Sequence, residues 1–206
     1  MHPRGPGMFC WLDLKTHDVG ATVTLLAESL GWRPEEPQAL RAAAVLAHDG
    51  HAVAGLSDLS HPVYPPGIPE HIAWYLAVDD VEARTRAALD AGAQLVVEPF
   101  ELPGVGAMST LMDPLGAAVS LWEQRGFAGW THAPGTPATP SAPQHQGADP
   151  DAAGDFYRRV LGLDDPEVRF VRGGGGDGSA WVPRINGLTE ALLTPGGIRL
   201  SPSGAA

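Results

Sequence analysis

The feature of this sequence that most restricts its fold is a strand-helix-strand pattern that occurs twice in the N-terminal part of the chain. An apolar, strand-like segment at residues 9–14 precedes a helix that begins at Asp18, and residues 71–78 precede a helix that begins at Asp80. Aspartate is a favoured N-cap, and each helix ends at a glycine, so both helices have defined ends. Self-similarity in a fixed order predicts two copies of one structural unit.

Strand-like segments follow each of these helices. In the first copy they are residues 39–47 and 51–56, separated by Asp49-Gly50, which is a hairpin-turn signal. The alanines of residues 39–47 also suit a helix, but the position between two turn regions favours a strand. In the second copy the strands are expected at residues 94–100, 106–112 and 117–122. The order predicts an α+β fold of two βαβββ modules, which together fill residues 8–124.

A change of composition follows the second module. Proline, threonine, glycine, glutamine and alanine dominate residues 125–148, and large apolar side chains almost vanish after Trp130. Such a segment buries too little surface to offset the entropy of ordering it. We therefore expect residues 125–148 to be a flexible linker.

The pattern then begins a third time. A helix capped by Asp149 matches the Asp18 helix, and residues 181–192 echo the strand and helix around Asp80. This copy is shortened, because the glycine-rich residues 173–178 stand where strands are expected, no apolar opening strand precedes Asp149, and the chain stops before the closing strands. Residues 149–206 are expected to form a truncated second domain that packs weakly on the first or is partly disordered.

Four segments carry a resemblance to a known family. They are residues 9–14, the Asp18 helix, the strand-to-helix junction at residues 78–83 and the turn Met112-Asp113-Pro114-Leu115-Gly116-Ala117. Together they resemble the vicinal oxygen chelate superfamily of glyoxalases, bleomycin-resistance proteins and extradiol dioxygenases, and in particular its tandem-domain, glyoxalase-like bacterial members. The resemblance implies paired βαβββ modules that form a concave mixed sheet, with a partial second copy at the C-terminus.

The same resemblance implies where a metal ligand would stand. The metalloenzymes of the superfamily hold a divalent ion with side chains on the first strand of each module and a glutamate on the last strand. In this sequence those positions are Trp11, Ala73 and Ser120. A catalytic site needs about three good protein ligands, and none of these residues is one. We expect no cofactor; the alternative is a divalent metal with displaced ligands, for which His71 is the candidate.

The alternation of side chains along each strand predicts which residues face the concave side. The residues expected to line a ligand cavity there are Phe9, Trp11, Asp13, His71, Tyr75, Ser120 and Trp122. An apolar pocket with a few polar groups is the usual form of a small-molecule site, and aromatic faces favour a flat or cationic ligand. The alternative is that these aromatic residues fill a core or cover a domain interface.

Asp13 is the sharpest candidate of this set, because a carboxylate among aromatic rings needs a partner or a shifted pKa. Lys15 shares its face of the strand, and a pair with Lys15 would make Asp13 structural. Otherwise Asp13, or His71, is the candidate catalytic acid-base group of an enzyme. Cys10 is expected to face the helices as a buried, unreactive thiol.

Composition restricts the partners. The formal net charge is −11 and Lys15 is the only lysine, which disfavours nucleic acid and anionic membranes. No apolar run approaches the ~20 residues of a membrane span, and no signal-peptide layout or cysteine pair is present. We expect a cytoplasmic protein that binds a small organic molecule and can pair as a homodimer. The alternative is a lyase, isomerase or dioxygenase acting on a small organic substrate.

Overall fold

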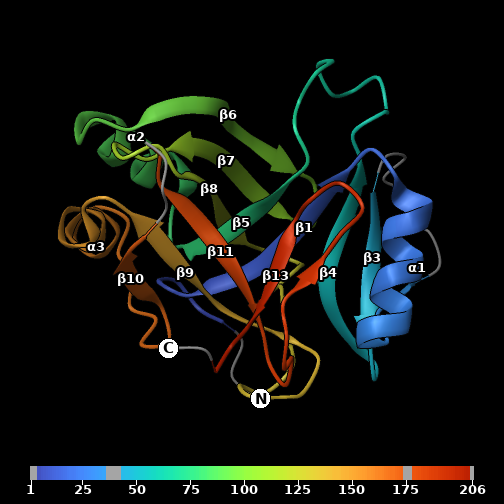
Figure 1. Ribbon diagram of the computed structural model, residues 1–206. Coiled ribbons are helices and arrows are strands. Elements are labelled where there is room, and N and C mark those ends of the chain that lie inside the picture. Colours follow the sequence, from blue (N-terminus) through green and yellow to red (C-terminus); the bar gives the residue numbers. More distant parts are fainter. Residues whose placement is uncertain (1–3, 36–42, 174–177, 205–206) are drawn as a thin grey trace. The chain divides into compact units, whose positions relative to one another are not determined.

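The contacts of the chain divide it into two compact units. The computed structural model describes residues 4–35, 43–173 and 178–204 (Figure 1). Unit 1 consists of Met1–Cys10, Trp74–Gly129 and Ala142–Val182, and unit 2 consists of Trp11–Ala73, Trp130–Ser141 and Pro183–Ala206. Each unit therefore combines segments that are far apart in the sequence.

Unit 2 holds most of the first module. Its elements are β1 (Phe9–Thr16, which begins in unit 1), α1 (Val19–Leu30), β2 (Arg33–Pro34), β3 (Ala43–His48) and β4 (His51–Asp58). The strands run in the order β2-β3-β4-β1, with β1 parallel to β4 and β3 antiparallel to β4. The ambiguous segment at residues 39–47 is a strand from Ala43 onward, and its first four residues lie outside the described part of the chain.

Unit 1 holds most of the second module. Its elements are β5 (His71–Val78), α2 (Val81–Asp90), β6 (Gln94–Leu102), β7 (Gly106–Met112) and β8 (Ala118–Gln124). The strands run in the order β5-β8-β7-β6, with β5 parallel to β8 and the other pairs antiparallel. The predicted α+β fold with two βαβββ modules is confirmed.

The helix ends follow the capping residues. The carboxylates of Asp18, Asp80 and Asp149 accept hydrogen bonds from the backbone amides three residues ahead, at 2.9, 2.8 and 3.0 Å. Gly31 ends α1 with φ of 70°, in the left-handed region that favours glycine. At the β3–β4 hairpin, Asp49 and Gly50 have φ of 47° and 78°, the positive values that a type I′ turn requires.

The C-terminal part contains more structure than its composition predicts. Its elements are β9 (Pro140–Gly147), α3 (Pro150–Arg159), β10 (Arg169–Arg172), β11 (Ala180–Ile185), β12 (Leu192–Leu193) and β13 (Arg199–Pro202). The prediction of a flexible linker is wrong for residues 140–147, which form the opening strand that seemed to be missing. β9 pairs in parallel with β10 along four residues, so its order comes from tertiary pairing and not from strand propensity.

One pairing recurs in all four copies of the module. The first strand lies parallel to the last: β1 to β4, β5 to β8, β9 to β10 and β11 to β13. In the third copy the chain passes from α3 to β10 with none of the two intervening strands among the described residues. In the fourth copy residues 187–191 form a turn where a helix was predicted. The closing strands are therefore present, and the second half of the chain is shortened internally.

A buried polar cluster joins the third copy to the second within unit 1. Asp113, of the turn before β8, accepts a hydrogen bond at Oδ2 from the Tyr157 hydroxyl at 2.9 Å, and His145 Nε2 lies 3.3 Å from the same oxygen. Trp181 Nε1 donates to the Tyr157 hydroxyl at 2.9 Å. Tyr157 and His145 are fully buried. The expectation of weak packing is therefore wrong for this part of the third copy.

The cluster fixes the charge of Asp113. Burial alone would raise the pKa of Asp113, but hydrogen bonds from His145, Tyr157 and the backbone amides of Ala117 and Leu115 outweigh burial and lower it below its usual value. Burial and the neighbouring Asp113 charge raise the pKa of Tyr157 well above its usual value. The carboxylate is thus ionised and the phenol is neutral at pH 7.

Among the helices of the described residues, none has the length and apolar character needed to cross a membrane.

Candidate functional site: an aromatic sheet face

The positions that correspond to metal ligands do not fit a divalent ion. The side chains of Trp11 and Ala73 offer no metal-binding oxygen, sulfur or imidazole nitrogen. The Ser120 hydroxyl lies 2.8 Å from the Thr110 hydroxyl, and Ser120 is only 2% exposed. Within the described ranges of the chain, no group of three or more His, Cys, Asp or Glu side chains is placed to hold a metal. We therefore derive no chemical step through the metal that the resemblance implies.

Two rows of side chains cross the sheet of unit 1 on one face. Strand register places Tyr75, Ser120, Thr110 and Val97 opposite one another in one row, and Ala77, Trp122, Met108 and Phe100 in the next. Directly opposed residues share a face of a sheet. We call these eight residues the aromatic face. The rings of Tyr75 and Trp122 meet edge to face, with their centroids 6.2 Å apart.

The aromatic face changes from buried to open across the sheet. Trp122 is buried, whereas Val97 and Phe100 on β6 are 39% and 42% exposed. None of its eight side chains carries a formal charge, and the hydroxyls of Ser120, Thr110 and Tyr75 are its polar groups. The face can therefore offer a flat apolar surface and a few hydrogen bonds, but no ionic contact.

The Trp122 indole is held in place from two sides. Its Nε1 donates a hydrogen bond to the carbonyl of Phe127 at 3.0 Å. The Phe127 ring packs edge to face with the indole, and the two ring centroids are 6.1 Å apart. Gly106 lies directly against the indole, because a Cβ at this position would come within 2.4 Å of it. A rigid aromatic side chain loses little conformational entropy when a ligand packs on it.

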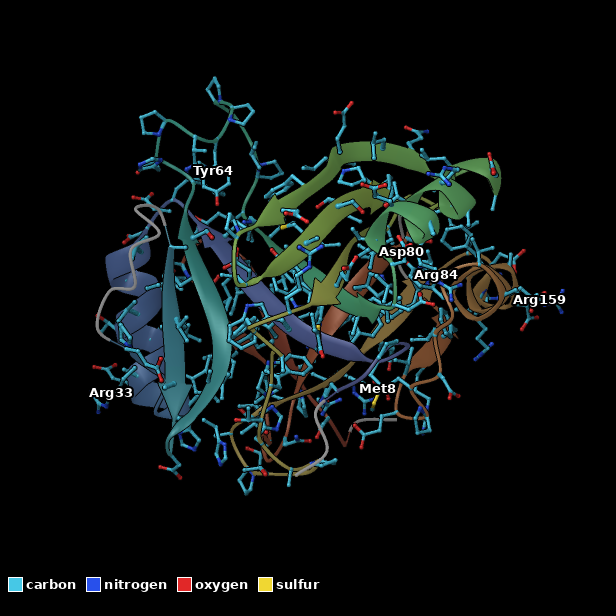
Figure 2. All side chains as sticks on the ribbon, turned by 180° about the vertical axis from the view of Figure 1, so that it is seen from behind. Met8, Arg33, Tyr64, Asp80, Arg84 and Arg159 are labelled. Atoms are coloured by element: carbon cyan, nitrogen blue, oxygen red, sulfur yellow. The ribbon has the colours of Figure 1, made fainter. Side chains whose placement is uncertain are left out.

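Asp13 belongs to a separate polar cluster in unit 2. Its Oδ2 accepts hydrogen bonds from Lys15 Nζ and from the Ser57 hydroxyl, both at 2.7 Å. Lys15 Nζ also lies 3.3 Å from the hydroxyl of Tyr64, in the loop after β4 (Figure 2), and 5.0 Å from the centre of its ring. Burial would lower the pKa of Lys15, but Asp13 and then Tyr64 outweigh burial and raise it. Of the two alternatives for Asp13, the ion pair with Lys15 is the one observed.

The second oxygen of Asp13 lies against the backbone of β4. Asp13 Oδ1 is buried and accepts no hydrogen bond from the described part of the chain, and a Cβ at Gly55 would approach it to 2.5 Å. Gly55 pairs directly with Asp13 in the parallel register. Glycine at this position is therefore what allows the carboxylate to lie flat on the strand.

The other predicted site residues have more ordinary surroundings. Phe9 is fully buried and packs against the rings of Trp74 and Trp181 in unit 1, which agrees with the alternative of a core residue. Trp11 is 8% exposed. His71 begins β5, and its Nδ1 lies 2.8 Å from the carbonyl of Pro69 in the preceding loop.

Cys10 is buried as predicted. It has no exposed surface, and burial raises its pKa to about 12. Its thiol donates a weak hydrogen bond to the carbonyl of Tyr75 at 3.5 Å. A thiol with so high a pKa is not a nucleophile at neutral pH.

The sequence reasoning missed half of the aromatic face. Four of its residues, Val97, Phe100, Met108 and Thr110, lie on β6 and β7, whereas the predicted cavity residues came from the first strand of each module and the last strand of the second. Pairing β6 and β7 as a hairpin would have placed Met108 and Thr110 opposite Trp122 and Ser120. The two register shifts on β6 are not visible in the sequence, so the facing of Val97 and Phe100 required the structure.

Comparison with known proteins finds relatives of similar sequence. No protein-family model matches the chain. CFP32 of Mycobacterium tuberculosis, provisionally named a glyoxylase, is 31% identical over 170 residues, which cover 79% of this chain and 63% of CFP32. The anthracycline biosynthesis protein DnrV of Streptomyces peucetius is 30% identical over 171 residues, covering 77% of this chain and 62% of DnrV. The chain therefore spans less than two thirds of the length of these relatives.

Solved structures share the fold. The Mn(II)-bound glyoxalase from Novosphingobium aromaticivorans matches with a TM-score of 0.68 and 16% identity, covering 96% of this chain and 82% of that one. An extradiol ring-cleaving dioxygenase from B. fuscum matches with a TM-score of 0.58 and 13% identity, covering 96% and 72%. At these identities the likeness concerns the fold alone. Taken with the sequence relatives and the paired βαβββ modules, it shows that the chain is similar to the glyoxalases and extradiol dioxygenases of the vicinal oxygen chelate superfamily.

Proposed function

We propose that this glyoxalase- and bleomycin-resistance-like protein binds a small, flat aromatic molecule on the aromatic face, without the usual metal of its superfamily. The observation that carries the proposal is the pair Ser120 and Trp122 on β8. Where the metalloenzymes have a glutamate, the Ser120 hydroxyl is hydrogen-bonded to the Thr110 hydroxyl, and the next residue on the same face of β8 is Trp122 with its immobilised indole. On this proposal an aromatic surface takes the place of the ion.

The charges in the aromatic face and in the polar cluster around Asp13 favour a neutral aromatic ligand over a cationic one. The aromatic face has no carboxylate, and the carboxylate of Asp13 already has Lys15 and Ser57 as partners. Two relatives, DnrV and DauV, are named for anthracycline biosynthesis, and anthracyclines are planar polycyclic aromatic compounds. These names support a flat ring system as the class of ligand.

The alternative is an enzyme that acts on a small organic substrate with Asp13 or His71 as acid-base group. It has less support, because Asp13 is ion-paired and His71 contacts the carbonyl of its own preceding loop. A general base needs a free lone pair within hydrogen-bond reach of the substrate.

The test is a fluorescence titration of the purified chain with an uncharged, fluorescent anthracycline aglycone, with and without chelator, for the wild type and two variants. Phe100→Ala removes a ring from the open edge of the aromatic face. Leu95→Ala is the matched control, since Leu95 is a similarly exposed apolar residue of β6 (40%) that pairs with Leu111 on the opposite face. We expect Phe100→Ala to weaken binding about fivefold, Leu95→Ala to leave it unchanged and chelator to have no effect.

Three results would contradict the proposal. They are stoichiometric metal in the purified protein, binding that chelator abolishes, and equal affinities of the two alanine variants. Absence of any saturable binding would also count against it, since the probe is a member of the proposed ligand class.

A further inference from the structure

β6 is an edge strand with an unusual surface. In the strand order of unit 1 it pairs with β7 on one side, and it is the last strand of that order. Four apolar side chains of β6 are exposed: Leu95, Val96, Val97 and Phe100. Val96 is the most open of them at 55%. Exposed, apolar edge strands present unpaired backbone groups to any chain that can add a strand.

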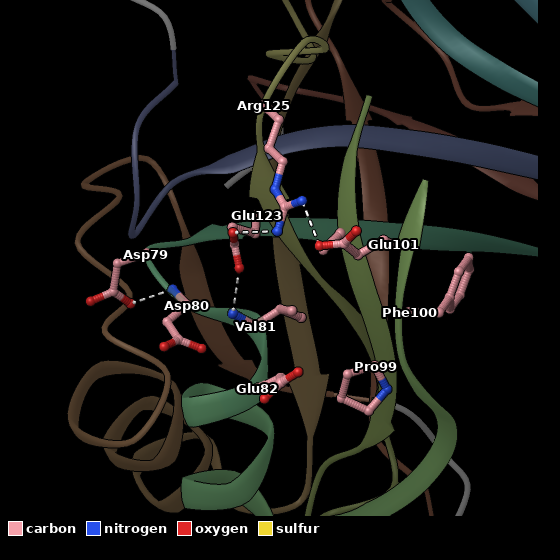
Figure 3. Close-up of a pocket in the computed structure, with 10 residues that line it drawn as sticks. Asp79, Asp80, Val81, Glu82, Pro99, Phe100, Glu101, Glu123 and Arg125 are labelled. Atoms are coloured by element: carbon pink, nitrogen blue, oxygen red, sulfur yellow. Dashed lines mark hydrogen bonds and ion pairs between the residues drawn. The ribbon is translucent and has the colours of Figure 1, made fainter. Parts of the chain in front are cut away.

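An acidic pocket lies beside this edge. Pro99, Phe100 and Glu101 of β6 line a pocket of about 380 Å³ together with Asp79, Asp80, Val81, Glu82, Ala107, Glu123 and Arg125 (Figure 3). Five carboxylates and one guanidinium give the lining a formal charge of −4. Arg125 binds Glu101 at 2.6 Å and Glu123 at 3.3 Å, so the one cation of the lining is already shared.

Of the remaining acidic groups, Asp79 is ion-paired with Arg84 at 2.9 Å, whereas Asp80 and Glu123 have local hydrogen-bonding roles that leave their charge in place. Glu123 accepts a hydrogen bond from the Val81 amide at 3.1 Å, and the Asp80 carboxylate caps α2. Glu98 lies on β6 itself, close in sequence to the pocket residues. Carboxylates are therefore concentrated at one end of the apolar edge of β6. This combination attracts a segment that carries cationic side chains.

From this arrangement we propose that the edge of β6 and its acidic pocket dock an extended, basic segment of a partner protein. Residues Gln94–Glu98 would pair with the segment as an added strand, because Pro99 has no amide hydrogen to offer beyond them. Lysine or arginine side chains of the segment would then reach Glu98, Glu101 and the pocket. Apolar side chains of the segment would cover Val96 and its neighbours.

A second copy of this chain fits the edge less well. Pairing β6 with itself would bring Glu98 and Glu101 of both copies together, and like charges opposite one another destabilise a sheet. The net charge of −11 adds to this repulsion. Glutamates on an edge are a common protection against self-association, whereas they favour a basic partner.

The probe is a short blocked peptide of alternating lysine and valine, titrated onto the intact chain by fluorescence anisotropy. One control peptide replaces lysine by glutamate. Another carries N-methyl groups on alternate residues, which keeps its charge but removes the amides that pair with an edge. The proposal shares Val97 and Phe100 with the aromatic face, so the variants avoid these two residues and the two proposals can fail separately.

The decisive variants change charge equally at two exposed valines. Val96→Lys places a cation on the edge of β6, and Val63→Lys does so in a loop of unit 2, where Val63 is 66% exposed. We expect the lysine-valine peptide to bind and to slow hydrogen exchange in residues 94–98. Val96→Lys should weaken binding about tenfold, and Val63→Lys should leave it nearly unchanged. Neither control peptide should bind.

Equal weakening by Val96→Lys and Val63→Lys would overturn the proposal, since only net charge would then matter. Equal binding of the N-methylated peptide would overturn it as well, because no strand would be added. Absence of binding by the lysine-valine peptide, or binding that protects other segments, has the same consequence.

Discussion

Asp13 illustrates how one neighbour decides the role of a residue. The strand pattern places Lys15 on the same face, which leaves a free base and an ion pair as alternatives. The observed 2.7 Å distance between Lys15 Nζ and Asp13 Oδ2 selects the ion pair. No sequence pattern reports that distance, nor the Ser57 hydroxyl that arrives from β4. Of the seven residues predicted to line a cavity, Tyr75, Ser120 and Trp122 lie on the aromatic face, and ligand binding by any of the seven stays a prediction.

This ion pair leads to a stability prediction. Lys15→Met leaves the buried Asp13 carboxylate without a cation, which should lower the free energy of unfolding by about 3–5 kcal/mol. The double variant Asp13→Asn with Lys15→Met should recover most of the loss, because no buried charge remains. Denaturant unfolding at pH 7 measures both effects, with Arg33→Met as the control for an exposed cation. A loss in Lys15→Met no larger than in Arg33→Met would refute the structural role.

Elements with local signals were predictable, and elements made by pairing were not. The capping aspartates and the glycine stops gave α1 and α2, and the Asp49-Gly50 turn gave the β3–β4 hairpin. β9 has no such signal: its sequence contains two prolines, two glutamines and no branched apolar residue. It is a strand because β10 pairs with it and because His145 fits a buried place beside Asp113 and Tyr157.

Hydrogen exchange can test β9 directly. The backbone amides of Gln144–Gly147 should exchange about a hundredfold more slowly than those of residues 133–137, which form turns. The two segments differ in composition, so each measured rate is compared with the intrinsic exchange rate of its own sequence. Mass spectrometry of peptic fragments resolves them. Fast exchange in both segments would restore the interpretation of a flexible linker.

At the scale of the whole molecule, the fold class followed from the repeat, but the way in which the second half is shortened did not. The glycine-rich stretch at residues 173–178 predicts a shortened second half. The structure retains the first and last strands of the third and fourth copies. Among the described residues, the third copy has α3 but lacks the two strands between α3 and β10, and the fourth copy lacks the helix after β11. A repeat is recognised by comparing residue types at corresponding positions. The elements missing from the third and fourth copies leave too few corresponding positions for the comparison.

Acid sensitivity is a property of the whole chain that one carboxylate should influence. The pKa of Asp113 is lower in the folded protein than in the unfolded chain, so its contribution to stability is present above the unfolded pKa of about 3.9 and is lost as pH falls through the folded value. Asp113→Asn should cost about 2–3 kcal/mol at pH 7, and the cost should shrink below about pH 4.

Denaturant unfolding of the wild type and Asp113→Asn between pH 7 and pH 3 measures this difference. Asp165, whose pKa burial raises, acts with the opposite sign, but it is present in both proteins and cancels in the comparison. A difference between the two proteins that stays constant across this pH range would show that the charge of Asp113 is not what stabilises the cluster.

The turn at residues 187–191 has a practical use. It stands where the earlier first strands lead into a helix, and the strand pair β11 and β13 forms without one. Most of its residues are exposed, and lengthening an exposed loop costs little closure entropy. Protein engineers can therefore treat this turn as an insertion point, at which an epitope or a reporter domain is displayed between two strands that the fold already secures.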